Sequence, residues 1–204
     1  MLDKKHIKYF KKILPVDFVL SEEGDCWAYG YDNSKMHVMP ECVLFADTKT
    51  QIKDIVRYCF ENTIPITTRG RGTGNTGGSV PIENSVVLSL EKMNKIIDID
   101  ISNRLAVVQP GVINKTLQDE LHKENFFWGP DPSSQDYSTI GGNIANNSAG
   151  PRAIKYGTPR DNILGLEFIS GTGEIHKTGV KTSKGVVGLD LTRLFVGSEG
   201  VLGI

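Results

Sequence analysis

The chain has 204 residues, with 23 lysines and arginines against 24 aspartates and glutamates and a formal net charge of −1. This balance gives no overall positive field, so composition excludes nucleic acid as an expected partner. No apolar run approaches the roughly 20 residues that cross a bilayer, and the N-terminal stretch lacks the apolar core of a signal peptide. The three cysteines are isolated from one another, which is typical of a reducing compartment, so we expect a cytoplasmic protein.

The first element expected along the chain is an amphipathic helix within residues 1–15. Ile7, Phe10, Ile13 and Leu14 fall at near-helical spacing with lysines between them. Such a helix packs on its own domain, or at most touches a membrane surface peripherally.

Residues 42–69 predict a strand, a helix and a second strand. The strands are expected at 43–46 and 64–68, and either Thr48 or Thr50 is expected to cap the helix between them. The apolar residues of the helix recur at helical spacing. They are Ile52, Ile55, Val56, Cys59 and Phe60.

The second strand leads into RGRGTGNTGGSVP, residues 69–81, which contains a G-x-G-x-x-G string. In a dinucleotide-binding unit that string opens a helix, but here Pro81 and a strand near 86–88 follow. We therefore interpret the match as accidental and the stretch as a loop whose backbone N–H groups form an anion nest. Arg69 and Arg71 either add charge to this nest or are simply solvated.

Further along, the pattern predicts mixed strands and short helices. Two hairpins are expected, one pairing 96–100 with 105–109 and one pairing 166–170 with 174–177. A helix with Leu117 and Leu121 buried lies between them, and a short helix or turn carrying Leu189, Leu191, Leu194 and Phe195 precedes the end. The whole pattern predicts an α+β fold with a division near residues 82–90.

The stretch STIGGNIANNSAG, residues 138–150, is too small and polar for an ordinary core helix. Two interpretations stay open. Either it lets a ligand approach its glycines and offers hydroxyl and amide groups to a polar heterocycle, or it is a small-residue helix packed tightly on a sheet.

Four ordered motifs carry a family resemblance: RGRGTGNTGGSVP, DPSS with TIGGNIANNSAG, KYGTPRDNILGLE, and DLTRLFVGSEGVLGI. From about residue 30 to the end, the chain resembles FAD-linked oxidases of the vanillyl-alcohol-oxidase type with a PCMH-type FAD-binding domain. Within that superfamily it is most similar to the FAD subunit of glycolate oxidase and to FAD-dependent D-lactate and D-2-hydroxyglutarate dehydrogenases.

The resemblance implies an α+β domain of two α/β subdomains with FAD between them. Residues 1–30 would be an N-terminal helix and lead-in, residues 31–90 the subdomain with the pyrophosphate loop, and residues 91–204 the second subdomain. The substrate cap domain of the family would be absent, so the chain looks truncated.

The resemblance also implies which residues contact FAD. Those at the pyrophosphate are Arg69, Gly70, Arg71, Gly72, Thr73, Gly74, Asn75, Gly77 and Gly78. Those along the flavin and its ribityl chain are Pro132, Ser133, Thr139, Gly141, Gly142, Asn143, Ala145, Asn147, Ser148, Ala149 and Gly150. Those near the other edges of the cofactor are Tyr156, Gly157, Val201 and Ile204.

Two features bear on how the flavin is held. Family members with covalent FAD often carry a histidine where Thr73 stands, so we expect non-covalent FAD here. The stretch ANNSAG departs from the family's usual A-T-N-A-G-G at Asn146 and Ser148. Backbone N–H groups near residues 141–144 would favour flavin reduction.

The implied reaction is hydride transfer from a small 2-hydroxy acid, such as glycolate or D-lactate, to flavin N5. Three readings remain: the FAD-binding portion of such an enzyme, a flavin-binding module without turnover on its own, or a relative acting on a sugar lactone or an aromatic alcohol. In the glycolate oxidase type, an iron–sulfur subunit and a second flavin subunit complete the complex. No catalytic base can be nominated, because His6, His37, His122 and His176 stand singly, and no spacing indicates a metal.

Overall fold

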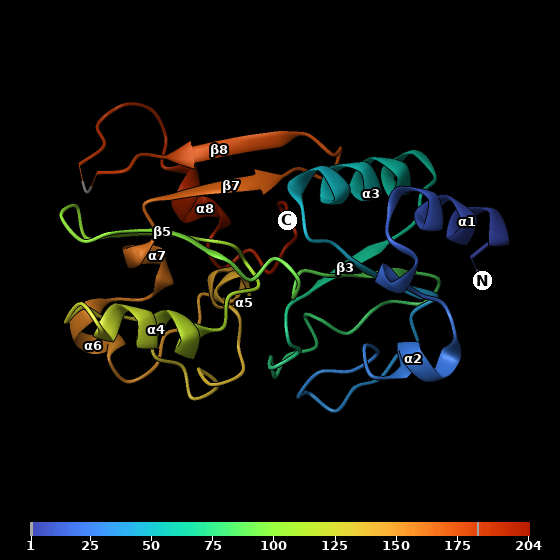
Figure 1. Ribbon diagram of the computed structural model, residues 1–204, viewed down its shortest axis with the longest axis horizontal. Coiled ribbons are helices and arrows are strands. Elements are labelled where there is room, and N and C mark those ends of the chain that lie inside the picture. Colours follow the sequence, from blue (N-terminus) through green and yellow to red (C-terminus); the bar gives the residue numbers. More distant parts are fainter. Residues whose placement is uncertain (1, 183) are drawn as a thin grey trace. The chain divides into compact units, whose positions relative to one another are not determined.

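The computed structural model describes residues 2–182 and 184–204 (Figure 1). The chain divides into two compact units, and each is treated by itself. The first comprises Met1–Met93 with Ile169–Glu174, and the second comprises Asn94–Phe168 with Ile175–Ile204. No helix in the described part of the chain is long and apolar enough to cross a membrane.

The first unit is built on a four-stranded sheet in the order β1-β2-β4-β3. Strands β2, β4 and β3 run parallel, and β1 pairs antiparallel with β2. The strands are β1 (Val19–Leu20), β2 (Cys42–Phe45), β3 (Ile66–Arg69) and β4 (Val86–Ser89). The helices are α1 (Lys4–Ile13), the 3-10 turn η1 (Val16–Phe18), α2 (Glu23–Trp27) and α3 (Lys49–Glu61).

The sequence of the central strands explains their burial. All residues of β2 and β4 are buried, as expected of parallel strands covered on both faces. On one face, Val43, Phe45 and Val87 pack against Cys26 of α2. Helices α1 and α3 lie on the opposite side of the sheet in Figure 1. This sheet fixes the end of β3, from which the glycine loop departs.

The predicted strand–helix–strand segment is confirmed. The structure also decides between the two possible caps of its helix and shows that one residue expected on the buried face is exposed. Thr48 caps α3, because its side chain accepts a hydrogen bond from the Gln51 amide and the Gln51 side chain accepts one from the Thr48 amide. Phe60 was expected on the buried face but is 61% exposed, while Ile52, Ile55, Val56 and Cys59 are buried. The predicted helix near the N-terminus is also confirmed, with Phe10 fully buried.

The second unit combines two two-stranded sheets with short helices. Its strands are β5 (Ile96–Asp100) and β6 (Leu105–Val108), then β7 (Gly165–Ile169) and β8 (Ile175–Gly179). Its helices are α4 (Asn114–His122), α5 (Ile140–Ala145), α6 (Ala153–Tyr156), α7 (Pro159–Asn162) and α8 (Leu191–Phe195). Val112, Leu117, Leu121 and Ile140 form its main apolar cluster.

Both predicted hairpins are confirmed. Strands β5 and β6 pair antiparallel, and the arrows of β7 and β8 run in opposite directions in Figure 1. The predicted helix with buried Leu117 and Leu121 is α4. Near the end, α8 confirms the short helix, in which Thr192 is buried, and Leu189, Leu191 and Leu194 are exposed. The α+β class is as expected.

Candidate FAD-binding site

The glycine loop joins two neighbouring parallel strands without a helix. Strand β3 ends at Arg69, β4 begins at Val86, and the described backbone between them forms only turns and bends. Gly72 and Gly77 have φ values of +65° and +83°, in the region that L side chains rarely adopt. The prediction that the G-x-G-x-x-G string opens no helix is therefore confirmed.

The backbone N–H groups of this loop are its available donors. Within the described ranges, the structure provides no protein acceptor for the N–H groups of residues 71–76. Successive N–H groups in a glycine-rich turn create a concave donor surface suited to an anion. The loop therefore fits a phosphate group through its backbone.

The two arginines of the loop already have protein partners. Arg69 is 6% exposed, and its guanidinium donates to the carbonyl oxygens of Tyr31 at 2.6 Å and Ser79 at 3.4 Å. Arg71 pairs with the Glu91 carboxylate at 3.3 Å near the surface. The backbone, more than these side chains, is thus left to bind an anion, and direct arginine contacts with a cofactor stay a prediction.

In the second unit, α5 begins at a Thr139 cap. The Thr139 hydroxyl accepts from the Gly142 amide at 3.1 Å. The amides of Ile140 and Gly141 donate to the carbonyl oxygens of Val112 and Pro110 at 2.7 and 2.8 Å. The first amides of α5 are therefore engaged within the protein, so they give no support to the expectation that they would favour flavin reduction.

Asn143 holds α5 to α4 through a buried amide network. Its Oδ1 accepts from Nδ2 of Asn114 at 2.8 Å, and its Nδ2 donates to Oγ of Ser138 at 3.1 Å. All three residues are buried. The side chain of Asn143 therefore orders the start of α5, and its contact with a flavin stays a prediction.

The two adjacent glycines of α5 differ in their surroundings. A Cβ on Gly141 would lie 2.7 Å from Cβ of Pro110 and 2.9 Å from its carbonyl oxygen. On Gly142, the nearest atom to an added Cβ would be Oγ1 of Thr139 at 3.2 Å. Tight packing thus explains Gly141, and at Gly142 the Thr139 cap is the one neighbour that an added Cβ would crowd.

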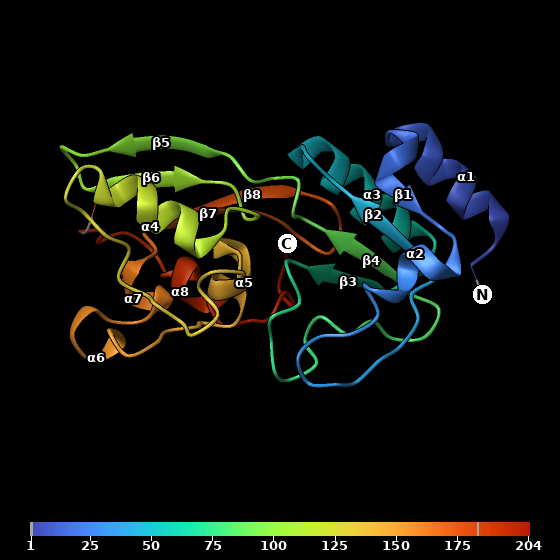
Figure 2. The same cartoon turned by 60° about the horizontal axis from the view of Figure 1, so that its bottom comes forward.

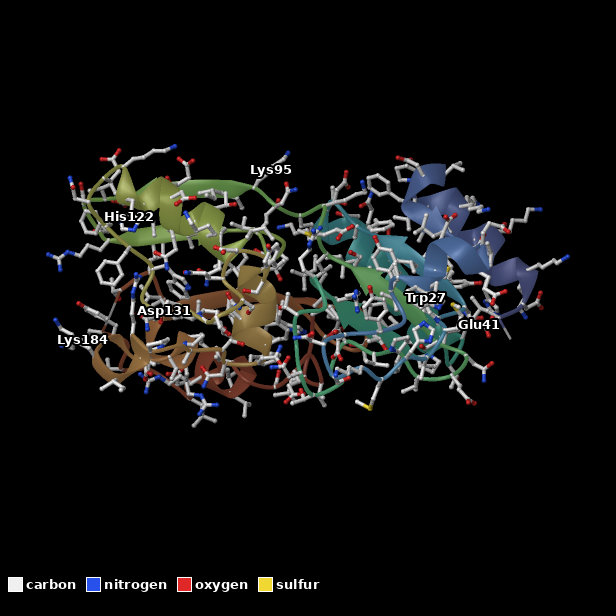
Figure 3. All side chains as sticks on the ribbon, turned by 90° about the horizontal axis from the view of Figure 1, so that it is seen from below. Trp27, Glu41, Lys95, His122, Asp131 and Lys184 are labelled. Atoms are coloured by element: carbon white, nitrogen blue, oxygen red, sulfur yellow. The ribbon has the colours of Figure 1, made fainter. Side chains whose placement is uncertain are left out.

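The chain around residues 145–150 is held by two other segments of the same unit. Asp131, which is labelled in Figure 3, donates its amide to the Ala149 carbonyl at 2.7 Å. Its carboxylate pairs with Arg152 at 3.3 Å. Glu199 donates its amide to the Ala145 carbonyl at 2.9 Å. The structure thereby holds the segments that lead to residues 132–133 and 201 against the predicted stretch 145–150, while Val201 itself is 85% exposed.

Tyr156 and Gly157 lie elsewhere in that unit. They belong to the end of α6, which Figures 1 and 2 show well apart from α5. Tyr156 packs on Phe127 with ring centroids 4.9 Å apart, and Gly157 leaves room for Asp161, which a Cβ would meet at 2.7 Å. The local geometry gives each a packing role.

Sequence reasoning missed the segment Tyr31–Met36, which lies against the glycine loop of the first unit. The Asn33 amide donates to the Gly74 carbonyl at 2.9 Å, and the Asn33 side chain donates to that of Asn75 at 3.0 Å. The only local signal is the spacing of Asp32 and Ser34, which suits an Asx turn and says nothing of a distant partner.

The histidines offer no metal site within residues 2–182 and 184–204, where no group of three metal-ligating side chains occurs. His6 Nδ1 lies 2.9 Å from the Tyr58 hydroxyl between α1 and α3. His37 Nε2 lies 3.3 Å from the Trp27 carbonyl. Both have structural partners.

An α+β fold with a glycine-rich loop whose amides lack protein acceptors is compatible with a nucleotide-cofactor-binding domain, and similarity to known proteins shows which family this is. Residues 40–179 match the family described as FAD binding domain, and the chain belongs to it. FAD is therefore its cofactor, and the free amides of the loop fit the diphosphate of that molecule.

Two named relatives are similar to this chain in sequence, and a solved structure shares its fold. The chain is 46% identical over 177 residues to the glycolate oxidase subunit GlcD of Bacillus subtilis, covering 86% of this chain and 38% of that protein. It is 37% identical over 200 residues to the D-lactate dehydrogenase of Anaerostipes hadrus, covering 97% and 42%. An alkyldihydroxyacetonephosphate synthase structure shares the fold, with a TM-score of 0.87, 22% identity, and coverage of 100% and 42%. The chain thus spans about two fifths of these proteins.

Proposed function

We propose that residues 69–78 bind the diphosphate of FAD through backbone N–H groups. The observation that carries this proposal is the run of amides at residues 71–76 without a protein acceptor in the described structure. Gly72 and Gly77 supply the positive φ angles that such a run needs. Phosphate oxygens are strong acceptors, and charge-assisted hydrogen bonds to them exceed neutral ones in strength.

We further propose that the segment around α5 contacts the flavin and its ribityl chain. Support comes from the backbone bonds of Asp131 and Glu199 to the Ala149 and Ala145 carbonyls, which hold the segments next to residues 132–133 and 201 against the stretch after α5. Tyr156, Gly157 and Ile204 remain proposed contacts from the family resemblance alone.

The cofactor is proposed to be held without a covalent bond from the glycine loop. Thr73 stands where covalent relatives often carry a histidine, and a threonine hydroxyl lacks the imidazole nitrogen that bonds to the flavin. Acid precipitation of the FAD-loaded protein should leave all flavin in the supernatant. Yellow colour retained in the washed pellet would contradict this proposal.

We propose that the longer protein to which this domain corresponds oxidises a small 2-hydroxy acid, with FAD as the hydride acceptor. The names of the relatives, a glycolate oxidase subunit and a D-lactate dehydrogenase, support this substrate class. A cytoplasmic location and association with an iron–sulfur subunit and a second flavin subunit belong to the same proposal.

The test begins with the chain loaded with FAD under anaerobic conditions. Glycolate, D-lactate, an aromatic alcohol and a sugar lactone are added separately, and reduction is followed as loss of the visible absorbance of the flavin. Turnover is then measured in a second experiment, in which a dye accepts the electrons. We expect stable FAD binding and slow reduction, confined to the 2-hydroxy acids. Preferential reduction by the aromatic alcohol or the lactone would overturn the substrate assignment, and FAD binding without any reduction would favour a binding module.

A further inference from the structure

The segment Tyr31–Met36, called here the brace, lies along the glycine loop of the first unit. Both ends of the brace contact the loop or the arginine that precedes it. At its start, the Tyr31 carbonyl accepts from Arg69. At its end, the Met36 methyl group would lie only 2.3 Å from a Cβ added to Gly77. With the Asn33 contacts to Gly74 and Asn75, the brace follows the loop over most of its length.

Asp32 is the buried charged residue of the brace. It is 3% exposed, and its carboxylate accepts from the Ser34 amide at 2.8 Å and the Ser79 hydroxyl at 3.5 Å. Burial opposes ionisation, but hydrogen bonds from Ser34 and from the amides of Ser79 and Gly77 outweigh it and lower the pKa of Asp32. The carboxylate is therefore ionised at neutral pH.

Arg69 supplies the opposite charge on the same side of the loop. Burial lowers the pKa of Arg69, and the nearby Asp32 carboxylate opposes that shift. The guanidinium binds carbonyl oxygens, whereas the carboxylate binds N–H and hydroxyl groups, so the two side chains engage complementary parts of the backbone. The positive charge of Arg69 nearby also limits the repulsion that the Asp32 carboxylate would exert on a phosphate.

We propose that Asp32 is a positioning residue for FAD, which fixes the Gly77–Ser79 end of the glycine loop so that the amides of residues 71–76 stay turned to the diphosphate. The inference rests on the proposed diphosphate site. Asp32 itself touches no phosphate in this arrangement. It accepts from the Ser79 hydroxyl at the far end of the loop, and the amides of residues 71–76 stay available for the cofactor.

The decisive variant is Asp32→Asn, which keeps the size of the side chain but removes its negative charge. It also replaces one accepting oxygen by an NH₂ group that faces the donors of Ser34 and Ser79. Asp17→Asn is the matched control, because Asp17 is exposed in η1 of the same unit. We expect Asp32→Asn to weaken FAD binding about tenfold or more, as the loss of charge-assisted hydrogen bonds predicts. Asp17→Asn should bind FAD as the unaltered chain does.

Measuring the affinity for FMN, which lacks the diphosphate bridge, distinguishes the positioning role from a general effect of Asp32 on the fold. The positioning role predicts that Asp32→Asn weakens FAD much more than FMN. Equal weakening of both ligands, or FAD binding unchanged in folded Asp32→Asn protein, would overturn the inference. If that variant does not fold, Ser34→Ala with Ser79→Ala removes hydroxyl donors and keeps the carboxylate, and the same selective loss of FAD is required.

A third arm separates this inference from the proposed site. Gly74→Ala adds a methyl group within the nest at ordinary contact distance, 3.8 Å from Oδ2 of Asp32. If Gly74→Ala loses FAD and Asp32→Asn does not, the positioning role alone fails. If Gly74→Ala binds FAD normally, the diphosphate site itself is wrong.

Discussion

Gly72 shows why a single residue of the loop resists substitution. Its φ of +65° disfavours any side chain, and an added Cβ would lie 2.2 Å from Nη2 of the buried Arg69. We expect Gly72→Ala to destabilise the fold by about 1–3 kcal/mol, because strain and displacement of the guanidinium combine.

Urea unfolding followed by circular dichroism measures this loss. Gly171→Ala is the control, since an added Cβ at Gly171 meets nothing within 4 Å. Equal unfolding midpoints for the two variants would show that the position of Arg69 beneath Gly72 does not constrain the loop.

The three cysteines should be inert in the folded protein. Burial raises the pKa of Cys26 to about 11 and that of Cys59 to about 12, and it raises the pKa of Cys42 as well. Because the folded state holds these protons more tightly, stability should fall as the pH rises above 9.0, the ordinary thiol value.

A thiol reagent such as DTNB at pH 8 checks the exposure of these groups. We predict slow reaction of the native chain and rapid reaction of all three thiols in denaturant. Rapid native labelling of any of them would contradict the packing around β2 and α3.

At the scale of the element, two variants of α3 test whether Thr48 is its N-cap. Thr48 completes a capping box with Gln51, whereas Thr50 lies exposed within the helix. Thr48→Ala should cost about 1 kcal/mol of unfolding free energy, and Thr50→Ala should be neutral or slightly stabilising. Thermal or urea unfolding of both variants distinguishes them, and the reverse order would show that the helix begins elsewhere.

The start of α5 depends on the buried amides of Asn143 and Asn114. Asn143→Ala leaves Nδ2 of Asn114 without its 2.8 Å partner, so we expect a loss of about 1–3 kcal/mol. Asn146→Ala should cost much less, because this residue is exposed and its side chain donates to the nearby Gly142 carbonyl at the end of the same helix. Similar unfolding midpoints for both variants would rule out the network as a support of this helix.

The elements also show what the sequence could predict. Apolar spacing placed α3, α4 and both hairpins, because those signals are local. Phe60 continues the same spacing but is 61% exposed, because the spacing of a helix alone does not tell where its covered face ends. The strand order β1-β2-β4-β3 and the two-residue β1 depend on tertiary pairing, which has no local signature.

At the same scale, the candidate site was predictable only in part. Glycines at positive φ marked the loop, since few other residues tolerate that conformation. Asp32 was not predictable, because its partners at Gly77 and Ser79 lie more than forty positions along the chain. The residue type of Asn143 predicts a cofactor contact, which stays a prediction, but it gives no sign of the buried bonds to Asn114 and Ser138 that the structure shows.

At the scale of the whole molecule, the chain is an FAD-binding domain that spans about two fifths of its relatives. What the domain contributes is the binding and orientation of the cofactor. We propose that the backbone after β3, shaped by glycines and held by Tyr31–Met36, recognises the diphosphate.

The most direct measurement is an FAD titration of the unaltered chain, Gly74→Ala and Gly171→Ala, followed by the change in flavin fluorescence. Both glycines accept a methyl group without a close protein contact, so neither variant should alter the fold. The account predicts that Gly171→Ala binds FAD normally and that Gly74→Ala binds it about tenfold more weakly or worse, because the methyl group obstructs the phosphates. Equal affinity of all three proteins for FAD would contradict the account.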